Sequence, residues 1–391
     1  MSHPPPVRVL HVIESTTAGV RRYVTYLLQQ QSPRWHMEVA CPIIRQANYG
    51  DVAFVDEIRR LGINVHDVPM QRAVGLSDVH ALRELWSVAR RGHYDLIHTH
   101  SSKAGFLGRL TARLNNVPVV HTPNGLYYLG QHGFKRWFYR TLEHLAGFLT
   151  TEMIAVSEGE RGVIARDRLV KPDRLCIIEN GVDAQQIRRQ ADSPEGAALR
   201  DRLKINGQRP VIGAAGRLVS QKDPFTFVRA AARLKESLPE AIFVWCGDGE
   251  LRAETEHLAA QLKVPLVVPG HQENSAAIMR AFDVFVLPSI YEGLPFALLE
   301  AMALGIPVVA TDIIGIRDVL EQQAAGWLTT PQDAEALAAG IAAAWTQSDE
   351  AQRRACAAQE LVETRFSVKR MMQQHVALYQ RVLQKNASRR M

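Results

Sequence analysis

Residues 283–312 constrain the fold more than any other part of the chain, because they predict four successive elements. Residues 284–287 form a continuous apolar run, as a buried parallel strand does. Residues 296–304 are strong helix formers and follow Pro295, a residue that suits the start of a helix. Residues 308–310 have the pattern of the next strand. A strand, a loop, a helix and a strand in succession indicate a unit of a parallel sheet.

Two carboxylates flank the predicted start of this helix. The first N–H groups of a helix are unpaired and its dipole is positive there, so a glycine loop before a helix can bind a phosphate group. Glu292 lies in the loop, and Glu300 lies more than one turn inside the helix, where it can accept hydrogen bonds from sugar hydroxyls. Glutamate is also common at solvated helix ends, so the pair alone leaves both interpretations open.

The letters of this stretch, EGLPFALLE followed by AMALGIPVVATD, resemble the retaining GT-B glycosyltransferases of family 4. The resemblance implies a nucleotide-sugar donor, with Glu292 facing its sugar as a catalytic residue and Glu300 holding its ribose. It further implies that Gly293, Leu294 and Pro295 bind the donor.

A second loop carries the two cations that the departure of a diphosphate requires. Residues 210–223 predict a strand followed by a loop that contains Arg217 and Lys222. Arginine binds an oxyanion through two N–H groups and lysine adds a point charge, so the pair can stabilise a leaving nucleoside diphosphate. The loop resembles the GRLxxxK motif of the same family, which implies catalytic roles for both cations and donor binding by Gly216. A family-like loop at Gly249 is also expected to bind the donor.

The N-terminal half alternates strand and helix patterns between residues 7 and 121. This alternation predicts another doubly wound parallel sheet, whose ligands bind at the carboxyl ends of the strands. Gly19 follows the first strand, and its conformational freedom would let the backbone approach the donor diphosphate. Family 4 usually has two adjacent glycines here, whereas Ala18 precedes Gly19 in this chain.

His98 and His100 lie on one face at the end of a predicted strand. Two imidazoles could ligate a metal ion, but no third histidine, cysteine or carboxylate recurs nearby at ligand spacing. We therefore expect both to line the ligand-binding cleft, with no bound metal. The run HTHSSKAG resembles a segment of bacterial polysaccharide glycosyltransferases, which implies that His98, His100 and Lys103 belong to the acceptor side.

Asn124 stands where relatives in family 4 commonly have a histidine beside the transferred sugar, and the nearest imidazole is His121. An asparagine can donate and accept hydrogen bonds but cannot carry a proton. If the family's histidine acts as an acid or base, this chain should be slow. If that histidine only orients the sugar, Asn124 can replace it. We favour the second interpretation and count Asn124 and His121 among the catalytic candidates.

Residues 133–149 include three cations beside aromatic rings: Lys135, Arg136 and Arg140 with Phe134, Trp137, Phe138 and Tyr139. Such a helix suits an anionic membrane surface, with its rings at the headgroup level and its cations towards the lipid. An ordinary helix that packs its aromatic side chains into the core explains the same pattern, and both interpretations stay open.

The composition places the chain in the cytoplasm. The four cysteines lack C-x-x-C spacing, no signal peptide precedes the first strand, and no window of about 20 uninterrupted apolar residues could span a bilayer. A formal charge of +6 favours an acidic partner, and the absence of a basic stripe argues against nucleic acid. Attachment to the inner face of the membrane is compatible with this charge.

With the resemblance, the sequence predicts an α/β protein of the GT-B fold, in which two Rossmann-like domains face each other across a cleft. Residues 1–190 form the acceptor-side domain, residues 191–365 form the nucleotide-sugar domain, and the helix in residues 366–391 crosses back. The expected reaction moves a sugar, with retention and without cofactor or metal, from a UDP- or GDP-sugar to a glycan or lipid-linked acceptor. The expected pathway is bacterial surface polysaccharide or glycolipid assembly. A nucleotide-sugar sensor without turnover and a GT-B sugar-nucleotide epimerase remain alternatives, and donor hydrolysis separates enzyme from sensor.

Overall fold

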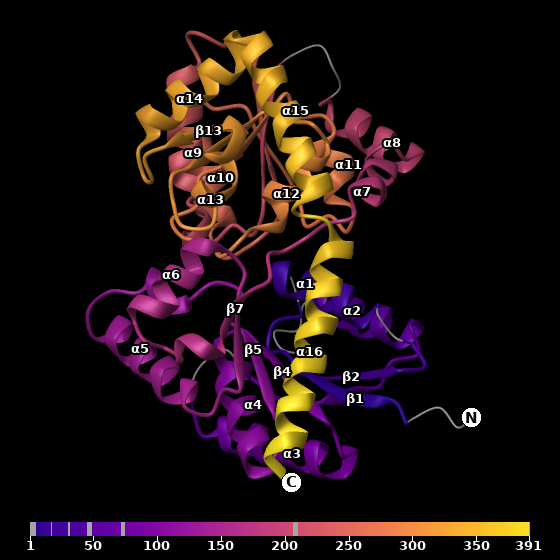
Figure 1. Ribbon diagram of the computed structural model, residues 1–391. Helices are drawn as coiled ribbons and strands as arrows, with labels where there is room; N and C mark the ends of the chain where they lie inside the picture. The colour runs from indigo at the N-terminus through magenta and orange to yellow at the C-terminus, as the bar shows by residue number, and fades with distance from the viewer. Residues whose placement is uncertain are drawn as a thin grey trace. The chain divides into compact units, whose positions relative to one another are not determined.

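The computed structural model describes residues 5–16, 18–29, 32–44, 49–71, 75–205 and 210–390 (Figure 1). The chain forms two compact units. Unit 1 comprises Met1–Glu179 with Met371–Met391, and unit 2 comprises Asn180–Arg370. Each unit is built around its own parallel sheet with helices, which confirms the predicted α/β class.

In the described part of unit 1, seven parallel strands follow the order β3-β2-β1-β4-β5-β6-β7. The strands are β1 Val7–Val12, β2 Trp35–Cys41, β3 Val65–Asp67, β4 Leu96–His100, β5 Val119–Thr122, β6 Glu152–Ala155 and β7 Leu175–Ile177. Their connections contain α1 Ala18–Leu28, α2 Tyr49–Arg60, α3 Ser77–Gly92, α4 Ser102–Leu114, α5 Gly133–Gly147 and α6 Glu158–Arg166. The short 3₁₀ turns are η1 Tyr127–Gly130 and η2 Pro172–Arg174.

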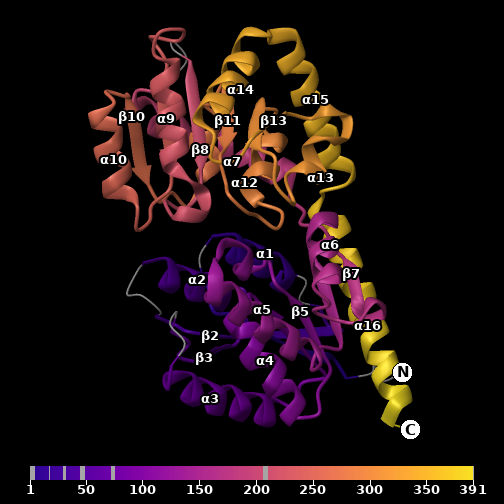
Figure 2. The same cartoon turned by 90° about the vertical axis from the view of Figure 1, so that its left-hand side faces the viewer.

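The two faces of this sheet differ in polarity because side chains alternate along a strand. Leu10, Val12 and Ile97 pack with apolar residues of α3 and α4 on one face. His11 and His98, which are direct register partners in β1 and β4, point to the other face. There α16 (Val368–Arg390) runs along the sheet, and its Tyr379 contacts His98 (Figures 1 and 2).

In the described part of unit 2, six parallel strands follow the order β10-β9-β8-β11-β12-β13. They are β8 Val211–Ala215, β9 Ile242–Cys246, β10 Leu266–Gly270, β11 Val284–Leu287, β12 Val308–Thr311 and β13 Trp327–Thr329. The helices are α7 Ala184–Ala191, α8 Pro194–Leu203, α9 Pro224–Leu234, α10 Arg252–Gln261, α11 Ser275–Met279, α12 Phe296–Ala303, α13 Arg317–Leu320, α14 Ala334–Thr346 and α15 Ser348–Thr364, with 3₁₀ turns η3 Ser220–Lys222 and η4 Gln322–Ala324. The central strands β8 and β11 are entirely buried, which explains why they are apolar throughout.

The chain passes from unit 1 to unit 2 after Glu179 and returns after Arg370. The sequence patterns placed these passages at residues 190 and 365. The polar segment in residues 191–208 has no strand periodicity and contains α8, while residues 206–209 lie outside the described residues. Ser193 caps α8 by accepting the Gly196 N–H at 3.2 Å. A serine cap followed by proline is a helix-start signal that the polar composition of this segment obscured.

Candidate functional site

The strand order of unit 2 reverses between β8 and β11, which are neighbours in the sheet but not consecutive in the chain. Open α/β sheets bind ligands at the carboxyl ends of their strands beside such a reversal. Arg217 and Lys222 follow β8, while Glu292 follows β11 and precedes α12. The two predicted donor motifs therefore meet at one edge of one sheet.

Lys222 and Glu292 form an ion pair at this edge. The Lys222 Nζ atom lies 2.5 Å from Glu292 Oε1, and their side chains are only 15% and 8% exposed. The Ser289 hydroxyl donates to the same carboxylate oxygen at 2.8 Å. Gln221 Nε2 lies 3.4 Å from the other oxygen and donates to the Tyr291 carbonyl at 3.0 Å. The structure thus joins residues that are 70 positions apart in the sequence.

Ser289 and Gln221 were not predicted as site residues. Ser289 occupies the first loop position after Pro288, where a small polar residue at a strand end is a usable signal. Nothing in the sequence marks Gln221, because its effect depends on the approach of a loop that lies 70 residues away. Both side chains hold Glu292 in one orientation before any ligand arrives.

The neighbouring helix start and cation complete the arrangement. Helix α12 begins at Phe296 after Pro295, whose side chain makes no capping hydrogen bond. A helix N-terminus presents backbone N–H groups and a positive dipole end to an anion. Arg217 is exposed in the loop after β8. A diphosphate at this edge would be near two side-chain cations and the end of one helix dipole.

Two glycines allow the loops of this edge to touch. A Cβ atom on Gly249 would lie 2.3 Å from the Leu218 carbonyl oxygen, and one on Gly315 would lie 1.7 Å from the Gly293 carbonyl oxygen. Gly315 also has a φ of +84°, which disfavours any other residue. Gly249 was predicted, whereas Gly315 was missed because its partner loop lies in a different motif.

Glu300 is buried in α12, and the hydroxyl of Ser275 donates to its carboxylate at 3.3 Å. Asn180 fixes the start of the same helix, because its Nδ2 group donates to the Leu294 carbonyl at 2.6 Å. The predicted donor residues Leu294 and Glu300 are thus held by two polar side chains outside the predicted motifs.

Unit 1 has a corresponding reversal between β1 and β4. Gly19 lies in the first turn of α1, after the end of β1, and is exposed. Lys103 lies in the first turn of α4, where its Nζ atom lies 2.7 Å from Asp78 Oδ1 and its backbone N–H donates to Glu14 at 3.2 Å. The predicted acceptor-side lysine is therefore bound to two carboxylates that the sequence analysis did not include.

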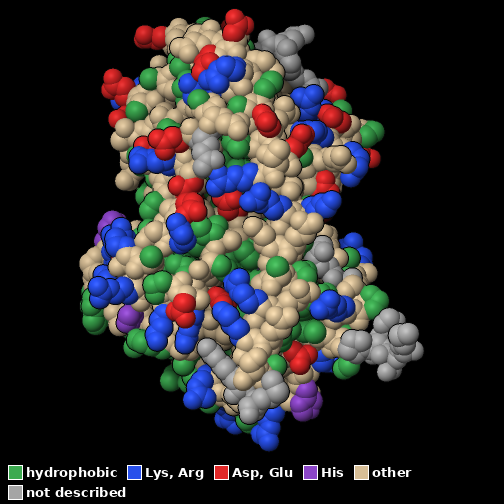
Figure 3. Space-filling model, viewed as in Figure 1, with side chains coloured by type: hydrophobic (Ala, Val, Ile, Leu, Met, Phe, Trp, Pro, Cys, Tyr) green, Lys and Arg blue, Asp and Glu red, His purple; other side chains and the backbone are tan. Residues whose placement is uncertain are grey.

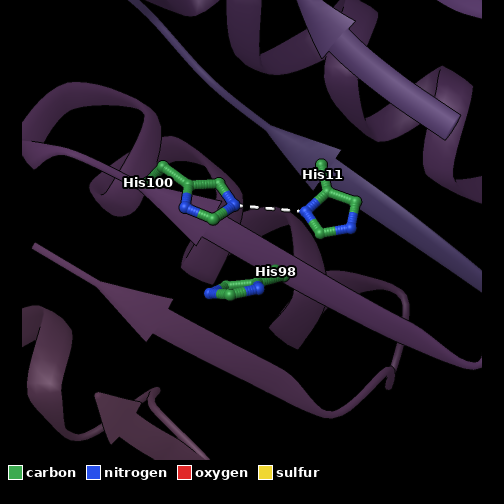
Figure 4. A group of neighbouring side chains, drawn as sticks. All are labelled: His11, His98 and His100. Carbon is green, nitrogen blue, oxygen red and sulfur yellow. Dashed lines mark hydrogen bonds between the residues drawn. The ribbon is translucent and has the colours of Figure 1, made fainter. Parts of the chain in front are cut away.

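A third histidine joins His98 and His100, contrary to the expectation that none lies at ligand spacing. His11 of β1 brings one ring nitrogen of each histidine within 4.8 Å of the others, and all three are fully buried (Figure 4). The sequence spacing missed this residue because His11 is 87 positions from His98 and meets it only through the β1–β4 register. We also expected His98 and His100 to line a cleft. Both side chains are instead fully buried.

Hydrogen bonds occupy most of the nitrogen atoms of this histidine cluster. His98 Nδ1 lies 2.6 Å from the Tyr379 hydroxyl, and its Nε2 lies 2.8 Å from Thr122 Oγ1. His11 Nδ1 lies 3.2 Å from His100 Nε2. A metal ion bound by all three would have to displace the partners of His98. Among the described residues, His11 Nε2 and His100 Nδ1 are buried without a hydrogen-bond partner, while the bond from His98 to Tyr379 holds α16 on the sheet.

Burial strongly favours neutral rings in this cluster. Desolvation lowers the pKa of His11 to about 3, helped by the nearby His375. Desolvation also holds the pKa of His98 and His100 well below the ordinary value, and each neighbouring histidine lowers it further. Neutral imidazoles can both donate and accept, which this network of rings and hydroxyls requires.

His121 is fully buried beneath α4. A Cβ atom on Gly105 of α4 would lie 2.4 Å from its ring, and its Nδ1 lies 2.9 Å from the Thr99 hydroxyl. Burial and the nearby Arg109 hold its pKa well below the ordinary value. This geometry gives His121 a packing role, and we leave it out of the proposed chemistry.

Asn124 is partly exposed in the turn after β5. Its φ is +55° and that of Gly125 is +98°, so two consecutive residues have left-handed backbone conformations. Among residues other than glycine, asparagine and histidine are enriched in this conformation. The backbone therefore permits either side chain at this position. Asn124 Nδ2 donates to the Thr122 carbonyl at 3.3 Å.

Comparisons with known proteins cover both units. The family described as Glycosyl transferases group 1 matches residues 197–361, and the family described as Glycosyl transferase 4-like domain matches residues 18–181. An Escherichia coli enzyme, UDP-Gal:alpha-D-GlcNAc-diphosphoundecaprenol alpha-1,3-galactosyltransferase, is 33% identical over 67% of this chain and 69% of its own length. The chain belongs to the GT-B glycosyltransferases of the family 4 type. This confirms the predicted family and enzyme class.

Other relatives agree with this assignment. The Staphylococcus aureus capsular polysaccharide biosynthesis glycosyltransferase CapM is 24% identical over 71% of this glycosyltransferase and 74% of its own length. The structure of HepE from Anabaena in complex with UDP and glucose superposes with a TM-score of 0.81 at 21% identity. It covers 96% of this chain and 99% of that one, which shows the same fold.

The remaining features bear on compartment and surface. The four cysteines are free. Among the described helices, none has both the length and the apolar composition that crossing a bilayer requires.

Proposed function

We propose that this glycosyltransferase transfers a sugar from a nucleoside diphosphate donor to a hydroxyl group of a lipid-linked glycan, with retention of the anomeric configuration. The observation that carries the donor side is the Lys222–Glu292 pair at the loop that leads into α12. Lys222 can form an ion pair with the diphosphate while Glu292 accepts hydrogen bonds from sugar hydroxyls. The pair therefore holds in place the two groups that the donor needs.

The proposed step needs no covalent enzyme intermediate. The bond between the anomeric carbon and the phosphate oxygen breaks, and the acceptor oxygen forms a new bond on the same face. Arg217, Lys222 and the α12 N-terminus stabilise the charge on the departing diphosphate. A phosphate oxygen of that leaving group takes the acceptor proton, so no side chain is required to act as an acid or a base. Glu292 and Asn124 orient the sugar, and Glu300 orients the ribose.

A lipid-linked acceptor is supported by the surface of α5. Phe134, Trp137 and Phe148 are 73%, 59% and 67% exposed, and with Leu145 they share one helical stripe. Figure 3 shows apolar and basic side chains together on the part of the surface where α5 lies. Solvent exposure of these rings does not fit the core-helix interpretation, whereas an interfacial helix requires it.

The other face of α5 is anchored in unit 1. Glu143 is buried and accepts a hydrogen bond from Arg109 NH2 at 2.8 Å, and Ala146 and Gly147 are buried beside it. The helix therefore has one face fixed to its unit and an apolar face exposed with cations such as Arg136 and Arg140 nearby. We place the enzyme at the cytoplasmic face of a membrane, in polysaccharide or glycolipid assembly.

The test is a transfer assay with the full chain. UDP-galactose and a short-chain N-acetylglucosamine diphospholipid are the first substrate pair, because the Escherichia coli relative is named for them. UDP- and GDP-linked hexoses and N-acetylhexosamines are then compared. The product is analysed for α or β linkage. A retained anomeric configuration with a lipid acceptor is expected, and binding of nucleotide sugars without transfer or hydrolysis would support a sensor instead.

A further inference from the structure

Glu160 is a buried carboxylate that forms no ion pair with a cation in the part of the chain that the structure describes. It lies in the first turn of α6 and is only 2% exposed. Its Oε1 atom accepts the Gly125 N–H at 2.9 Å, and its Oε2 atom accepts the Val156 N–H at 2.8 Å. One side chain thus ties the turn after β5 to the end of β6.

The local sequence would ordinarily make a self-contained helix cap. Ser157 caps α6 by accepting the Glu160 N–H at 3.1 Å. In a capping box, the glutamate at this position returns to the backbone N–H of the cap residue. Here one oxygen returns to Val156, the residue before the cap, and the other spans 35 residues to reach Gly125. A carboxylate at the third position of α6 is therefore used to hold a different loop.

One residue of the loop that Glu160 holds has a sparsely populated backbone conformation. Asn124 has a φ of +55°, which a residue other than glycine keeps only where surrounding contacts fix it, whereas Gly125 adopts its φ of +98° without strain. The Gly125 N–H belongs to the peptide group that follows Asn124. Its hydrogen bond to Glu160 therefore fixes the backbone next to the Asn124 side chain. Loss of the acceptor for this partly buried N–H also costs free energy.

We propose that Glu160 is a positioning residue for sugar transfer, and that it acts by fixing the orientation of Asn124. This inference rests on the proposed function, in which Asn124 orients the transferred sugar. Glu160 itself contacts only the protein.

The charge state of Glu160 gives the proposal a distinctive signature. Burial raises its pKa from 4.5 to about 7, although the N–H groups of Val156 and Gly125 favour the ionised form. Tyr23 of α1 interacts with it and stays a neutral phenol, because burial raises the pKa of Tyr23 above its ordinary value. On α6, Glu158 and Arg161 pair with each other at 2.8 Å on the surface. Above pH about 7 both oxygens accept, and below it one carries a proton.

The first test is a double-mutant cycle with Glu160→Gln and Asn124→Ala in the transfer assay proposed above. Glutamine preserves the shape but turns an N–H group towards a backbone N–H. We expect Glu160→Gln to lower kcat about tenfold, with little change in donor KM, as loss of one buried hydrogen bond would do. In the Asn124→Ala background the same change should have almost no further effect. If the losses in kcat of the two single variants multiply in the double variant, Glu160 does not act through Asn124. Glu158→Gln is the matched control.

The second test does not need turnover. With asparagine and glycine labelled by ¹⁵N, the Gly125 amide and the Asn124 side-chain amide should titrate together near pH 7 in the wild-type chain. Both titrations should vanish in Glu160→Gln. Wild-type kcat should fall as pH decreases through the same value, and this limb should be absent in the variant.

These outcomes separate the two proposals. An absence of transfer by the wild-type chain would refute the proposed function, while the amide titration would still decide whether Glu160 controls Asn124. If the amides do not titrate, or titrate without any change in kcat, the positioning role is wrong. If Glu160→Gln fails to fold, the wild-type titration and pH profile still decide.

Discussion

The Lys222–Glu292 pair shows how single residues prepare the donor site. A partly buried ion pair held by Ser289 has little freedom to reorganise, so its groups are already oriented when the diphosphate arrives. Replacing Lys222 or Arg217 with alanine should therefore reduce kcat by about 10²–10³, or about 2.7–4 kcal/mol, as deletion of one preorganised oxyanion donor does. Steady-state transfer kinetics measure this loss.

Lys369→Ala is a matched control for these cations, because Lys369 is exposed on α16. Thermal unfolding of each variant is needed beside the kinetics, since removal of Lys222 also leaves the Glu292 carboxylate with only its neutral hydrogen-bond partners. Normal turnover by the Arg217→Ala, Lys222→Ala double variant would show that the diphosphate binds elsewhere.

The same cations lead to a prediction of metal independence. Two side-chain charges and the α12 dipole end can neutralise a diphosphate, so chelation with EDTA should leave activity largely unchanged. The histidine cluster is a separate check, because His98 already contacts Tyr379 and Thr122 through its two nitrogens. Elemental analysis should find less than one zinc ion per chain. Loss of activity on chelation, or stoichiometric zinc that disappears in His11→Asn, would contradict this.

Residue patterns in the sequence identified those site residues that belong to one short motif. Glu292 and Lys222 belong to short motifs whose chemistry is legible from their spacing to a strand end and a helix start. His11 and Gly315 act through partners on other elements, and only the sheet register or a loop contact brings these together. The left-handed backbone of Asn124 is likewise invisible in the sequence, although it explains which side chains the turn accepts.

At the scale of elements, α5 combines an anchored face with an exposed apolar stripe. We predict that the full chain sediments with vesicles of phosphatidylglycerol and phosphatidylcholine at low ionic strength, and is released as salt screens its cations. Replacing Phe134, Trp137 and Phe148 with serine should abolish sedimentation at any salt concentration. These side chains are exposed, so the unfolding temperature should change little.

Leu262→Ser controls for the general loss of an exposed apolar side chain, since Leu262 lies after α10 in unit 2. Equal binding by the triple variant and the wild-type chain would assign the stripe another partner. Binding that is unaffected by charged lipid would show that the cations near α5 have no part in it.

The buried strands could be predicted from the sequence pattern, because buried parallel strands are apolar runs between glycine and proline signals. Strand β11 has the expected bounds, Val284–Leu287. Helix α8 was missed because charged residues outnumber its buried ones, so its apolar pattern is weak and only the cap at Ser193 marks it. The two faces of α5 could not be distinguished either, since the sequence does not say which side packs on unit 1.

At the scale of the whole chain, the units differ in how they respond to acid. All the fully buried histidines among the described residues, His11, His98, His100, His121 and His375, lie in unit 1. Their pKa values are lowered by burial, that of His11 to about 3 and that of His375 to about 4. The unfolded chain binds a proton at each of these sites below pH about 6.5, whereas the folded unit does not.

Unit 1 is therefore most stable above pH about 6.5, and its free energy of unfolding decreases as pH falls towards the folded pKa values. At pH 5, His11 and His375 together should remove about 4 kcal/mol relative to pH 8, and the other three act in the same direction. Glu160 opposes this, because its pKa is raised to about 7 and the folded unit gains its proton first. That gain is about 2–3 kcal/mol at pH 5. Against a typical total of about 5–15 kcal/mol, unit 1 should be strongly weakened at this pH.

Hydrogen exchange in urea between pH 5 and 8 can resolve the two units and give the stability of each. We expect the free energy of unfolding to fall with decreasing pH in unit 1 and much less in unit 2. His375→Gln should reduce the slope of the unfolding free energy of unit 1 against pH by the equivalent of about one proton. Glutamine keeps a polar group beside Tyr23 but does not titrate. Glu160→Gln should steepen the slope, and the exposed His80→Gln should not change it. Equal acid sensitivity of the two units would mean that the buried histidines are already protonated or accessible in the folded chain.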